Sequence, residues 1–371
     1  MKIAQIIYTG FGGLGSVAFS LAEADKQRRH EWIIGFIGDL PIDQSYPLRC
    51  AANGVAWQEF RSTPGRPYSA WLALARWLGR ERPDAVILHT INSILPCRWY
   101  AWRHPVPLIA VEHKSSDLKT RSEWMASYLS MLLADQVVLL TPEYGQELAK
   151  AHGLLYRPDK IAIIANGIDT GAFHPATDRI RERGTVRLGM AARFSFSKRQ
   201  DLLVETVSLL KAQKPEVNWQ LSLAGDGDRY EAVCKLAAEL GVEGIVQFEG
   251  LLDESQLIRW LRGLDIYVHA SQGETLSTSL LQAMATGLPI VASDISGIAN
   301  LIGRDESCGL LAPTDSMSFA KQIVRLTEDV EAMKDFSDRG RAVCQRQYSN
   351  AFMLQNYLAL ITELRGPCDE T

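Results

Sequence analysis

The stretch DIYVHASQGETLSTSLLQAMATGLPIVAS, residues 265–293, holds two short apolar runs on either side of a helix-like segment. The runs at 265–270 and 288–292 are too continuously apolar for a strand with one wet face. Continuous apolar strands joined by a helix are typical of a parallel sheet that helices cover on both faces. The stretch therefore predicts a β-α-β unit.

The same alternation repeats on both sides of a polar break at NGIDTGAFHPATDRIRERGT, residues 166–185. We therefore predict an α/β fold of two doubly wound, Rossmann-like domains that face a ligand-binding cleft. The expected parts are an N-terminal domain at 1–172, a linker at 173–185, a C-terminal domain at 186–345, and a final helix and tail at 346–371. The strand-like runs are IAQIIY, EWIIGFI, DAVILH, VPLIAVE, DQVVLL and KIAIIA before the break, and TVRLGMA, WQLSLAG, GIVQFEG, DIYVHA, LPIVAS and CGLLAP after it.

Composition narrows the function classes. Hydrophobic residues make up 47% and charged residues 22% of the 371 residues, with a formal net charge of −4. These values are ordinary for a globular protein and give no reason to expect a nucleic-acid partner. The six cysteines form no CxxC pair, which fits a reducing compartment. The N-terminus has no signal-peptide pattern, so we expect a cytoplasmic protein.

A glycine turn follows the first predicted strand. Gly10, Gly12 and Gly15 in TGFGGLGSVAF fit G-x-G-x-x-G, and a helix pattern comes next. Glycine lets backbone N–H groups approach a phosphate, and a helix N-terminus carries partial positive charge. Asp39, after the second strand, lies roughly where a dinucleotide fold places an acid. The alternative is a tight turn with no ligand.

Two cations flank the loop that follows the first strand of the second half. Arg193 and Lys198 in AARFSFSKRQD suit a diphosphate, because arginine binds oxygens in a fork and lysine acts as a point charge. A solvated basic loop is the alternative. Nearby, Asp226 and Asp228 resemble a metal-binding pair, but a G-D-G-D sequence is ordinary turn chemistry, and we expect no metal.

The stretch 265–293 places polar groups at the N-terminus of its predicted helix. Glu274 precedes the helix, Thr278 and Ser279 lie at its start, and Gln282 lies inside it. The hydroxyls could cap the helix or receive a phosphate. A carboxylate so close to a buried strand needs a partner, which sugar hydroxyls could supply.

Several motifs, in one order, resemble those of family 4 glycosyltransferases. SQGETLSTSLLQAMATGLPIVAS is similar to the E-x7-E region of that family, and GGLGSVAFSLAEA to its glycine loop. IIANGIDTGAF resembles its V-x-x-N-G-x-D-x-x-x-F motif, and GMAARFSFSKRQDLLVETVSLL its R-x-x-x-x-K-G segment. LAGDGDRYEAV and VQFEGLLDESQL fall in the family's order. The resemblance implies a GT-B fold and a retaining transfer of a sugar from a nucleotide-diphosphate donor to an acceptor hydroxyl, with no metal.

The resemblance also implies roles by matched position. Glu274 would hold donor sugar hydroxyls, and His113, after an apolar strand, would lie near the reacting sugar; these two are the expected catalytic residues. The expected donor-binding residues are Gly13, Arg193 and Lys198 at the diphosphate, Thr278 and Ser279 through their N–H groups, Leu252 near the base, and Gln282 at the ribose.

Two positions depart from the family pattern. Gln282 replaces the second glutamate of E-x7-E, so it can accept a hydrogen bond from ribose but without charge assistance. Arg199 replaces the glycine after the lysine. We expect an active enzyme, although a non-catalytic donor-binding relative is an alternative.

The acceptor is harder to predict. GRPYSAWLALARWLGRERP and PCRWYAWRHP mix arginine with tryptophan and tyrosine, which suits a membrane interface but also a helix packed on a sheet. We therefore expect a glycan or lipid-linked acceptor, a role in polysaccharide or lipopolysaccharide biosynthesis, and peripheral contact with the inner membrane surface. A GT-B nucleotide-sugar epimerase and a nicotinamide-dependent oxidoreductase are the rival functions. The oxidoreductase leaves Lys198 and Glu274 without a role.

Overall fold

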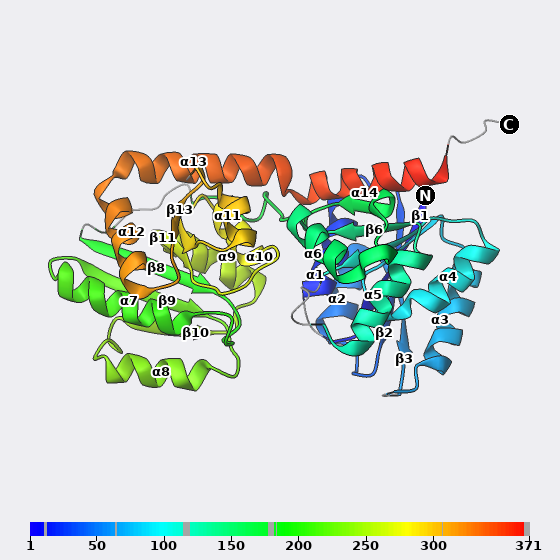
Figure 1. Ribbon diagram of the computed structural model, residues 1–371, viewed down its shortest axis with the longest axis horizontal. Helices are drawn as coiled ribbons and strands as arrows, with labels where there is room; N and C mark the ends of the chain where they lie inside the picture. The colour runs from blue at the N-terminus through cyan, green and yellow to red at the C-terminus, as the bar shows by residue number, and fades with distance from the viewer. Residues whose placement is uncertain are drawn as a thin grey trace. The chain divides into compact units, whose positions relative to one another are not determined.

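A computed structural model describes residues 1–10, 13–63, 65–113, 119–176, 182, 184–305 and 307–366, without side-chain detail for 13–16 (Figure 1). The chain divides into two compact units. Unit 1 comprises Met1–Gly167 and Asn350–Thr371, and unit 2 comprises Ile168–Ser349. Each unit is described by itself below.

Unit 1 is built on a seven-stranded sheet with the order β3-β2-β1-β4-β5-β6-β7, and every neighbouring pair is parallel. The order reverses direction between β1 and β4, which makes this point the topological switch of the sheet. The strands are β1 (Lys2–Tyr8), β2 (Glu31–Gly38), β3 (Ala56–Arg61), β4 (Ala85–Leu88), β5 (Leu108–Glu112), β6 (Gln136–Leu139) and β7 (Ile161–Ile163).

Helices cover both faces of this sheet. In β1, Ile3 and Ile7 belong to one buried cluster, while Ala4 and Ile6 belong to another, as expected for side chains that alternate across a strand. This double burial explains why the strands are continuously apolar in sequence. The helices are α1 (Gly13–Ala24), α2 (Ser45–Asn53), α3 (Tyr68–Glu81), α4 (Ile94–Arg103), α5 (Arg121–Leu133), α6 (Pro142–His152) and α14 (Asn350–Arg365).

Unit 2 repeats the design with a six-stranded parallel sheet of order β10-β9-β8-β11-β12-β13. Its switch point lies between β8 and β11. The strands are β8 (Thr185–Ala191), β9 (Asn218–Ala224), β10 (Val246–Gly250), β11 (Ile266–His269), β12 (Ile290–Ser293) and β13 (Leu310–Ala312). The helices are α7 (Gln200–Gln213), α8 (Tyr230–Glu239), α9 (Glu254–Gly263), α10 (Thr278–Ala285), α11 (Ser296–Ile302), α12 (Ser316–Glu328) and α13 (Val330–Gln347).

The structure divides the chain differently from the sequence-based boundaries. The first boundary lies between Gly167 and Ile168 rather than at 172, and Phe173 is buried in a core cluster of unit 2 rather than lying in a linker. The final helix is not a separate part, because α14 packs against α1 in the core of unit 1. Residues 177–181 and 183 of the predicted linker lie outside the described residues.

The GT-B class of fold is confirmed by these two doubly wound sheets. Among the described residues, no helix combines the length and the apolar character needed to cross a bilayer.

Candidate active site

The candidate site in unit 2 lies at the switch point of the sheet, where loops from adjacent strands meet. β8 and β11 are neighbours, and the loop after β8 bonds directly to the segment after β11. The Arg199 N–H donates to the Ala270 carbonyl at 3.0 Å, and the Gln272 N–H donates to the Ser197 carbonyl at 2.8 Å. These backbone bonds bring together Lys198 and Glu274, which are far apart in sequence.

Glu274 has two protein partners. Lys198 Nζ forms an ion pair with Glu274 Oε1, and His269 Nε2 lies 3.0 Å from the same oxygen. His269 is fully buried near the end of β11, and Glu274 is 14% exposed. The sequence alone suggested sugar hydroxyls as the partner of this carboxylate. The structure shows that the protein itself supplies two partners. The partial exposure of the carboxylate leaves it open to a ligand.

The protonation states follow from this geometry. Burial alone would raise the pKa of Glu274, but the hydrogen bond from His269 and the charge of Lys198 outweigh burial and lower the pKa to about 2. Burial lowers the pKa of His269, so at neutral pH the imidazole is uncharged and donates its Nε2–H to Glu274. The site thus holds an anion and a cation side by side, oriented by a neutral histidine.

The start of α10 lies beside this cluster. Ser277 caps the helix by accepting from the Leu280 N–H at 3.4 Å, and its hydroxyl lies 3.5 Å from His269 Nε2. Thr278 and Ser279 occupy the first turn, where backbone N–H groups have no acceptor within the helix. The predicted pair is therefore positioned to present N–H groups, and the cap is Ser277 rather than either of them.

The other predicted donor-binding residues of unit 2 lie on elements of the same sheet. Arg193 follows β8 and is exposed, and its side chain has no ion pair among the described residues. Gln282 is half-buried inside α10, and Leu252 is half-buried two residues after β10. The carboxyl ends of parallel strands share one edge, so residues after β8, β10 and β11 lie along one side of unit 2.

The G-D-G-D turn after β9 has a structural explanation. Gly225 and Gly227 have φ of +131° and +148°, and a Cβ at either would overlap the carbonyl oxygen of Ala192 or Phe194. Asp226 accepts from the N–H of Gly227 within the turn at 2.7 Å. This turn supports the loop that carries the cations. Within the described ranges, no group of three or more His, Cys, Asp or Glu side chains is arranged to hold a metal.

The site residues predicted for unit 1 also lie at the carboxyl edge of their sheet. α1 begins at Gly13 after β1, while Gly12 and the side chains at 13–16 lie outside the described detail. His113 follows β5 directly and is half-buried. Its Nε2 lies 3.0 Å from Nδ1 of His89, a buried residue after β4 that sequence reasoning did not select.

A chain of hydrogen bonds orients His113. His89 Nε2 lies 3.0 Å from Gln5 Oε1, and Gln5 Nε2 donates to the Ala18 carbonyl at 2.8 Å. The Gln5 oxygen can only accept, so His89 donates from Nε2, accepts at Nδ1, and receives the Nε2–H of His113. This arrangement leaves His113 Nδ1 as an acceptor. Burial lowers the pKa of His113 to about 4, so the ring is neutral near pH 7.

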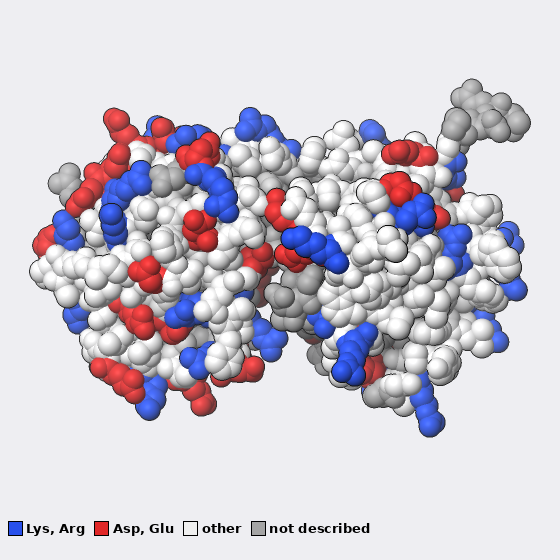
Figure 2. Space-filling view, viewed as in Figure 1, with Lys and Arg blue, Asp and Glu red and all other residues white. Residues whose placement is uncertain are grey.

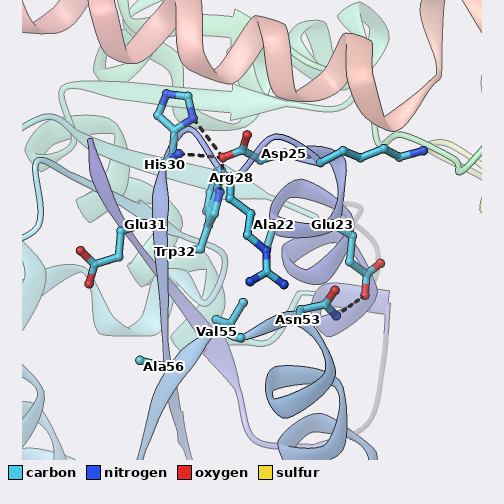
Figure 3. A pocket seen from close by; sticks show the side chains of 12 residues that line it. Ala22, Glu23, Asp25, Arg28, His30, Glu31, Trp32, Asn53, Val55 and Ala56 are labelled. Atoms are coloured by element: carbon cyan, nitrogen blue, oxygen red, sulfur yellow. Dashed lines mark hydrogen bonds and ion pairs between the residues drawn. The ribbon is translucent and has the colours of Figure 1, made fainter.

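A hollow in unit 1 lies at the amino-terminal edge of the sheet, opposite the edge that holds His113 (Figure 3). Glu31 and Ala56, the first residues of β2 and β3, line it. Asp25 accepts from the N–H groups of Arg29 and His30, and from the Trp32 indole at 3.2 Å. Ligands of doubly wound sheets bind at the carboxyl edge, so we assign this hollow a structural role.

Comparison with solved structures supports the same fold class. HepE (Alr3699) of Anabaena in complex with UDP is similar with a TM-score of 0.82 and 17% sequence identity, over 98% of this chain and 100% of that one. The lipopolysaccharide outer core galactosyltransferase WaaB, in its apo form, is similar with a TM-score of 0.70 and 19% identity, over 97% and 99%. At such low identity these likenesses show the fold alone.

Sequence comparison shows the family. Residues 11–172 match "Glycosyltransferase Family 4", and residues 185–329 match "Glycosyl transferases group 1". A D-inositol 3-phosphate glycosyltransferase of Streptomyces bingchenggensis is 27% identical over 281 residues, which are 71% of this chain. The chain spans 57% of the length of that relative. The chain belongs to the family 4 glycosyltransferases, as its motifs predicted.

Proposed function

We propose that this protein is a retaining glycosyltransferase that moves a sugar from a nucleotide-diphosphate donor to an acceptor hydroxyl without a metal ion. The observation that carries the proposal is the cluster of Lys198, Glu274 and His269 at the switch point of unit 2. Negative charge develops on the pyrophosphate as the bond to the sugar breaks, and fixed cations stabilise such a leaving group. Lys198 and the exposed Arg193 supply that charge.

The remaining roles follow from position. Glu274 exchanges part of its contact with Lys198 for donor sugar hydroxyls when the pyrophosphate arrives, because the phosphate oxygens then compete for the lysine. The N–H groups of Thr278 and Ser279 contact the diphosphate from the first turn of α10. In unit 1, Gly13 begins α1 and offers its N–H to a phosphate. Gln282 accepts from ribose and Leu252 contacts the base, while His113 presents its Nδ1 near the reacting sugar.

The donor class is supported by the similar structure of HepE, which was solved with UDP. We therefore propose a nucleotide sugar as the donor and UDP as the first nucleotide to test. The base and the sugar are not specified by the residues described above.

A role in surface polysaccharide or lipopolysaccharide synthesis is supported by two observations. One is the similarity to WaaB, and the other is the surface of α3, α4 and α5. Arg103 stacks over the Trp99 ring at 4.2 Å in α4, a pairing that suits the boundary between lipid and water. Figure 2 shows few charged side chains over α5. Exposed apolar side chains on these helices are Tyr68, Leu72, Leu95, Trp99, Trp102, Met125 and Leu132. We propose that this face contacts the inner membrane surface.

The experiment that tests the proposal has two steps. A thermal-shift screen against UDP-, GDP- and ADP-glucose identifies the nucleotide, because a ligand of the folded state raises apparent stability. Product formation with an added glycoside acceptor is then followed by NMR, which reports the anomeric configuration of the new bond. Retained configuration supports the proposal and inversion contradicts it. Rapid formation of a free 2-epimer from UDP-N-acetylglucosamine without an acceptor would favour the epimerase instead.

A further inference from the structure

A cavity of about 490 Å³ lies at the switch point of unit 1, and none of the predicted donor-binding residues is among its described lining residues. Tyr8 at the end of β1 and Thr90 after β4 line it, so it straddles the position where the strand order reverses. Crevices at this position of doubly wound sheets are ligand sites. The volume is in the range of pockets that hold small molecules, about 300–1,000 Å³.

One part of the lining is polar and suits a polyhydroxyl ligand. Ser62, Thr90 and Asn92 contribute hydroxyl and amide groups, which can both donate and accept hydrogen bonds. Asp39 contributes a carboxylate that accepts from the Tyr8 hydroxyl at 2.7 Å. That hydrogen bond lowers the pKa of Asp39, so the group is an anion at neutral pH. Its other lone pairs can accept from ligand hydroxyls.

The charge of the lining disfavours anions. Among the described residues that line the cavity, Asp39 is the ionised group and no Lys, Arg or His side chain is present. A phosphate brought here would meet a like charge and, within the described lining, no cation to neutralise it. This lining differs from that of the donor site, where Lys198 and Arg193 provide positive charge.

The other part of the lining is apolar and opens to solvent. Trp71 on α3, Leu95 on α4 and Met125 on α5 line the cavity. Leu95 is 42% and Met125 60% exposed, which places uncovered apolar surface at the cavity mouth. Aromatic rings and aliphatic side chains of this kind bind the apolar faces of ligands.

The cavity also adjoins the oriented histidine pair. Thr90 lines the cavity and follows His89, whose Nδ1 holds His113 in place. We propose that this cavity, the acceptor pocket, binds the acceptor and selects an uncharged glycoside that carries an apolar group, while it rejects acceptors that bear phosphate. The inference rests on the proposed function, since a glycosyltransferase requires an acceptor. It separates this protein from relatives whose name specifies an inositol phosphate.

The test measures the affinity of the 371-residue chain for defined acceptor analogues. The compounds are p-nitrophenyl β-D-glucopyranoside, methyl β-D-glucopyranoside, myo-inositol and inositol 3-phosphate, with dissociation constants from saturation-transfer NMR or calorimetry. We expect the aryl glucoside to bind at least about tenfold more tightly than the methyl glucoside, because its ring buries apolar surface. We expect inositol 3-phosphate to bind more weakly than inositol. The reverse order in either pair overturns the inference.

Variants locate the binding in the acceptor pocket. Met125→Ser should remove most of the preference for the aryl glucoside, whereas Leu132→Ser should retain it, because Leu132 is equally an exposed residue of α5 but lies outside the lining. Asp39→Asn keeps a hydrogen-bond acceptor for Tyr8 but removes the negative charge. The variant should therefore show a smaller difference in affinity between inositol and inositol 3-phosphate. Unchanged preferences in both pocket variants overturn the inference.

UDP binding is measured on the same samples. The acceptor-pocket variants should bind UDP as the wild type does, since they leave Lys198 and Arg193 intact. A wild type that binds UDP but fails the acceptor tests contradicts only the pocket assignment. A wild type that discriminates among the glycosides as expected but binds no nucleotide contradicts the proposed function and leaves the pocket assignment in place.

Discussion

Glu274 illustrates how the site is set at the scale of one residue. Its carboxylate is held as an anion by His269 and Lys198, and its folded pKa of about 2 lies below the ordinary glutamate value of 4.5. In acid, the unfolded chain therefore binds a proton before the folded chain does. The stabilisation is complete above the unfolded pKa and is lost as pH falls towards the folded one.

Glu274→Gln should remove this acid sensitivity. We expect the variant to be less stable than the wild type at about pH 5, with the difference shrinking at about pH 3.5, because only in the wild type does the unfolded chain take up a proton at this position over that range. Urea unfolding of both proteins at the two pH values measures this difference in stability. A stability difference that is the same at both would show that the carboxylate is not held as an anion by its neighbours.

Gln282 tests the departure from the family pattern. Gln282→Glu should keep or strengthen the affinity for UDP-glucose, because a charged acceptor forms a stronger hydrogen bond to a ribose hydroxyl than a neutral amide does. Calorimetry measures the change, with Gln213→Glu, at an exposed position on α7, as the control. Complete loss of binding in Gln282→Glu alone would mean that this side chain does not face the ribose.

The sequence singled out individual candidate residues of the site but could not predict how they meet. Lys198 and Glu274 were both predicted, but their pairing spans 76 positions and depends on backbone bonds that no local pattern encodes. His269 and His89 were missed because each sits in or beside an apolar strand and was taken as part of a buried run. A histidine at the carboxyl end of such a strand was the available signal.

At the scale of elements, the loop that holds Glu274 depends on close packing against α11. A Cβ on Gly297, near the start of that helix, would overlap the carbonyl oxygens of Glu274 and Thr275. Those atoms belong to the backbone, so the loop itself must move to accommodate a larger residue. The short α11 therefore limits where the backbone of Glu274 can lie.

Gly297→Ala should displace the Glu274 loop. We expect turnover to fall by at least about tenfold with the overall fold kept, because small displacements of catalytic groups are costly. Steady-state kinetics and circular dichroism measure the two effects. Gly263→Ala is the matched control, since a Cβ there meets nothing within 4 Å. Equal kinetics in the two variants would contradict the packing argument.

The strands that sequence reasoning found are those that carry a continuous apolar run. All six strands of unit 2 were anticipated by their apolar runs. In unit 1, β3 was missed because it is an edge strand whose side chains are largely exposed or half-buried, so AWQEFR lacks a continuous apolar pattern. An apolar pattern reports burial, and only one side chain of β3 is buried.

At the scale of the whole molecule, four histidines make both units sensitive to acid. Burial lowers the pKa values of His89, His113, His152 and His269. Between the unfolded value near 6.5 and the lower folded values, the unfolded chain binds more protons than the folded chain. The free energy of unfolding should therefore fall as pH decreases from about 6.5 towards about 4.

His113→Asn should make this decline shallower. The variant lacks one group that takes up a proton on unfolding, so its slope of stability against pH should be smaller by up to about one bound proton. Denaturant unfolding across this range measures the slope. A slope equal to that of the wild type would show that His113 is not held in its neutral form by burial.

The division of the chain is a property that local patterns could not supply. A helix pattern predicted the final segment, but only its packing shows that α14 joins the core of unit 1 after the chain has completed unit 2. The boundary between Gly167 and Ile168, earlier than predicted, is likewise set by packing rather than by a local pattern. Phe173 lies in a polar stretch that looks like a linker, yet it is buried in unit 2.

The central claim is that Lys198 serves the pyrophosphate of the donor, and it is tested most directly by comparing UDP with uridine. Lys198→Ala should weaken UDP binding by at least about tenfold while leaving uridine binding unchanged, because a charge-assisted contact to phosphate contributes about 1.5–3 kcal/mol and uridine has none. Lys214→Ala, which removes an exposed lysine of unit 2 paired with Glu328, should bind both compounds as the wild type does. UDP affinity that is unchanged in Lys198→Ala, or an equal loss for UDP and uridine, would contradict the account.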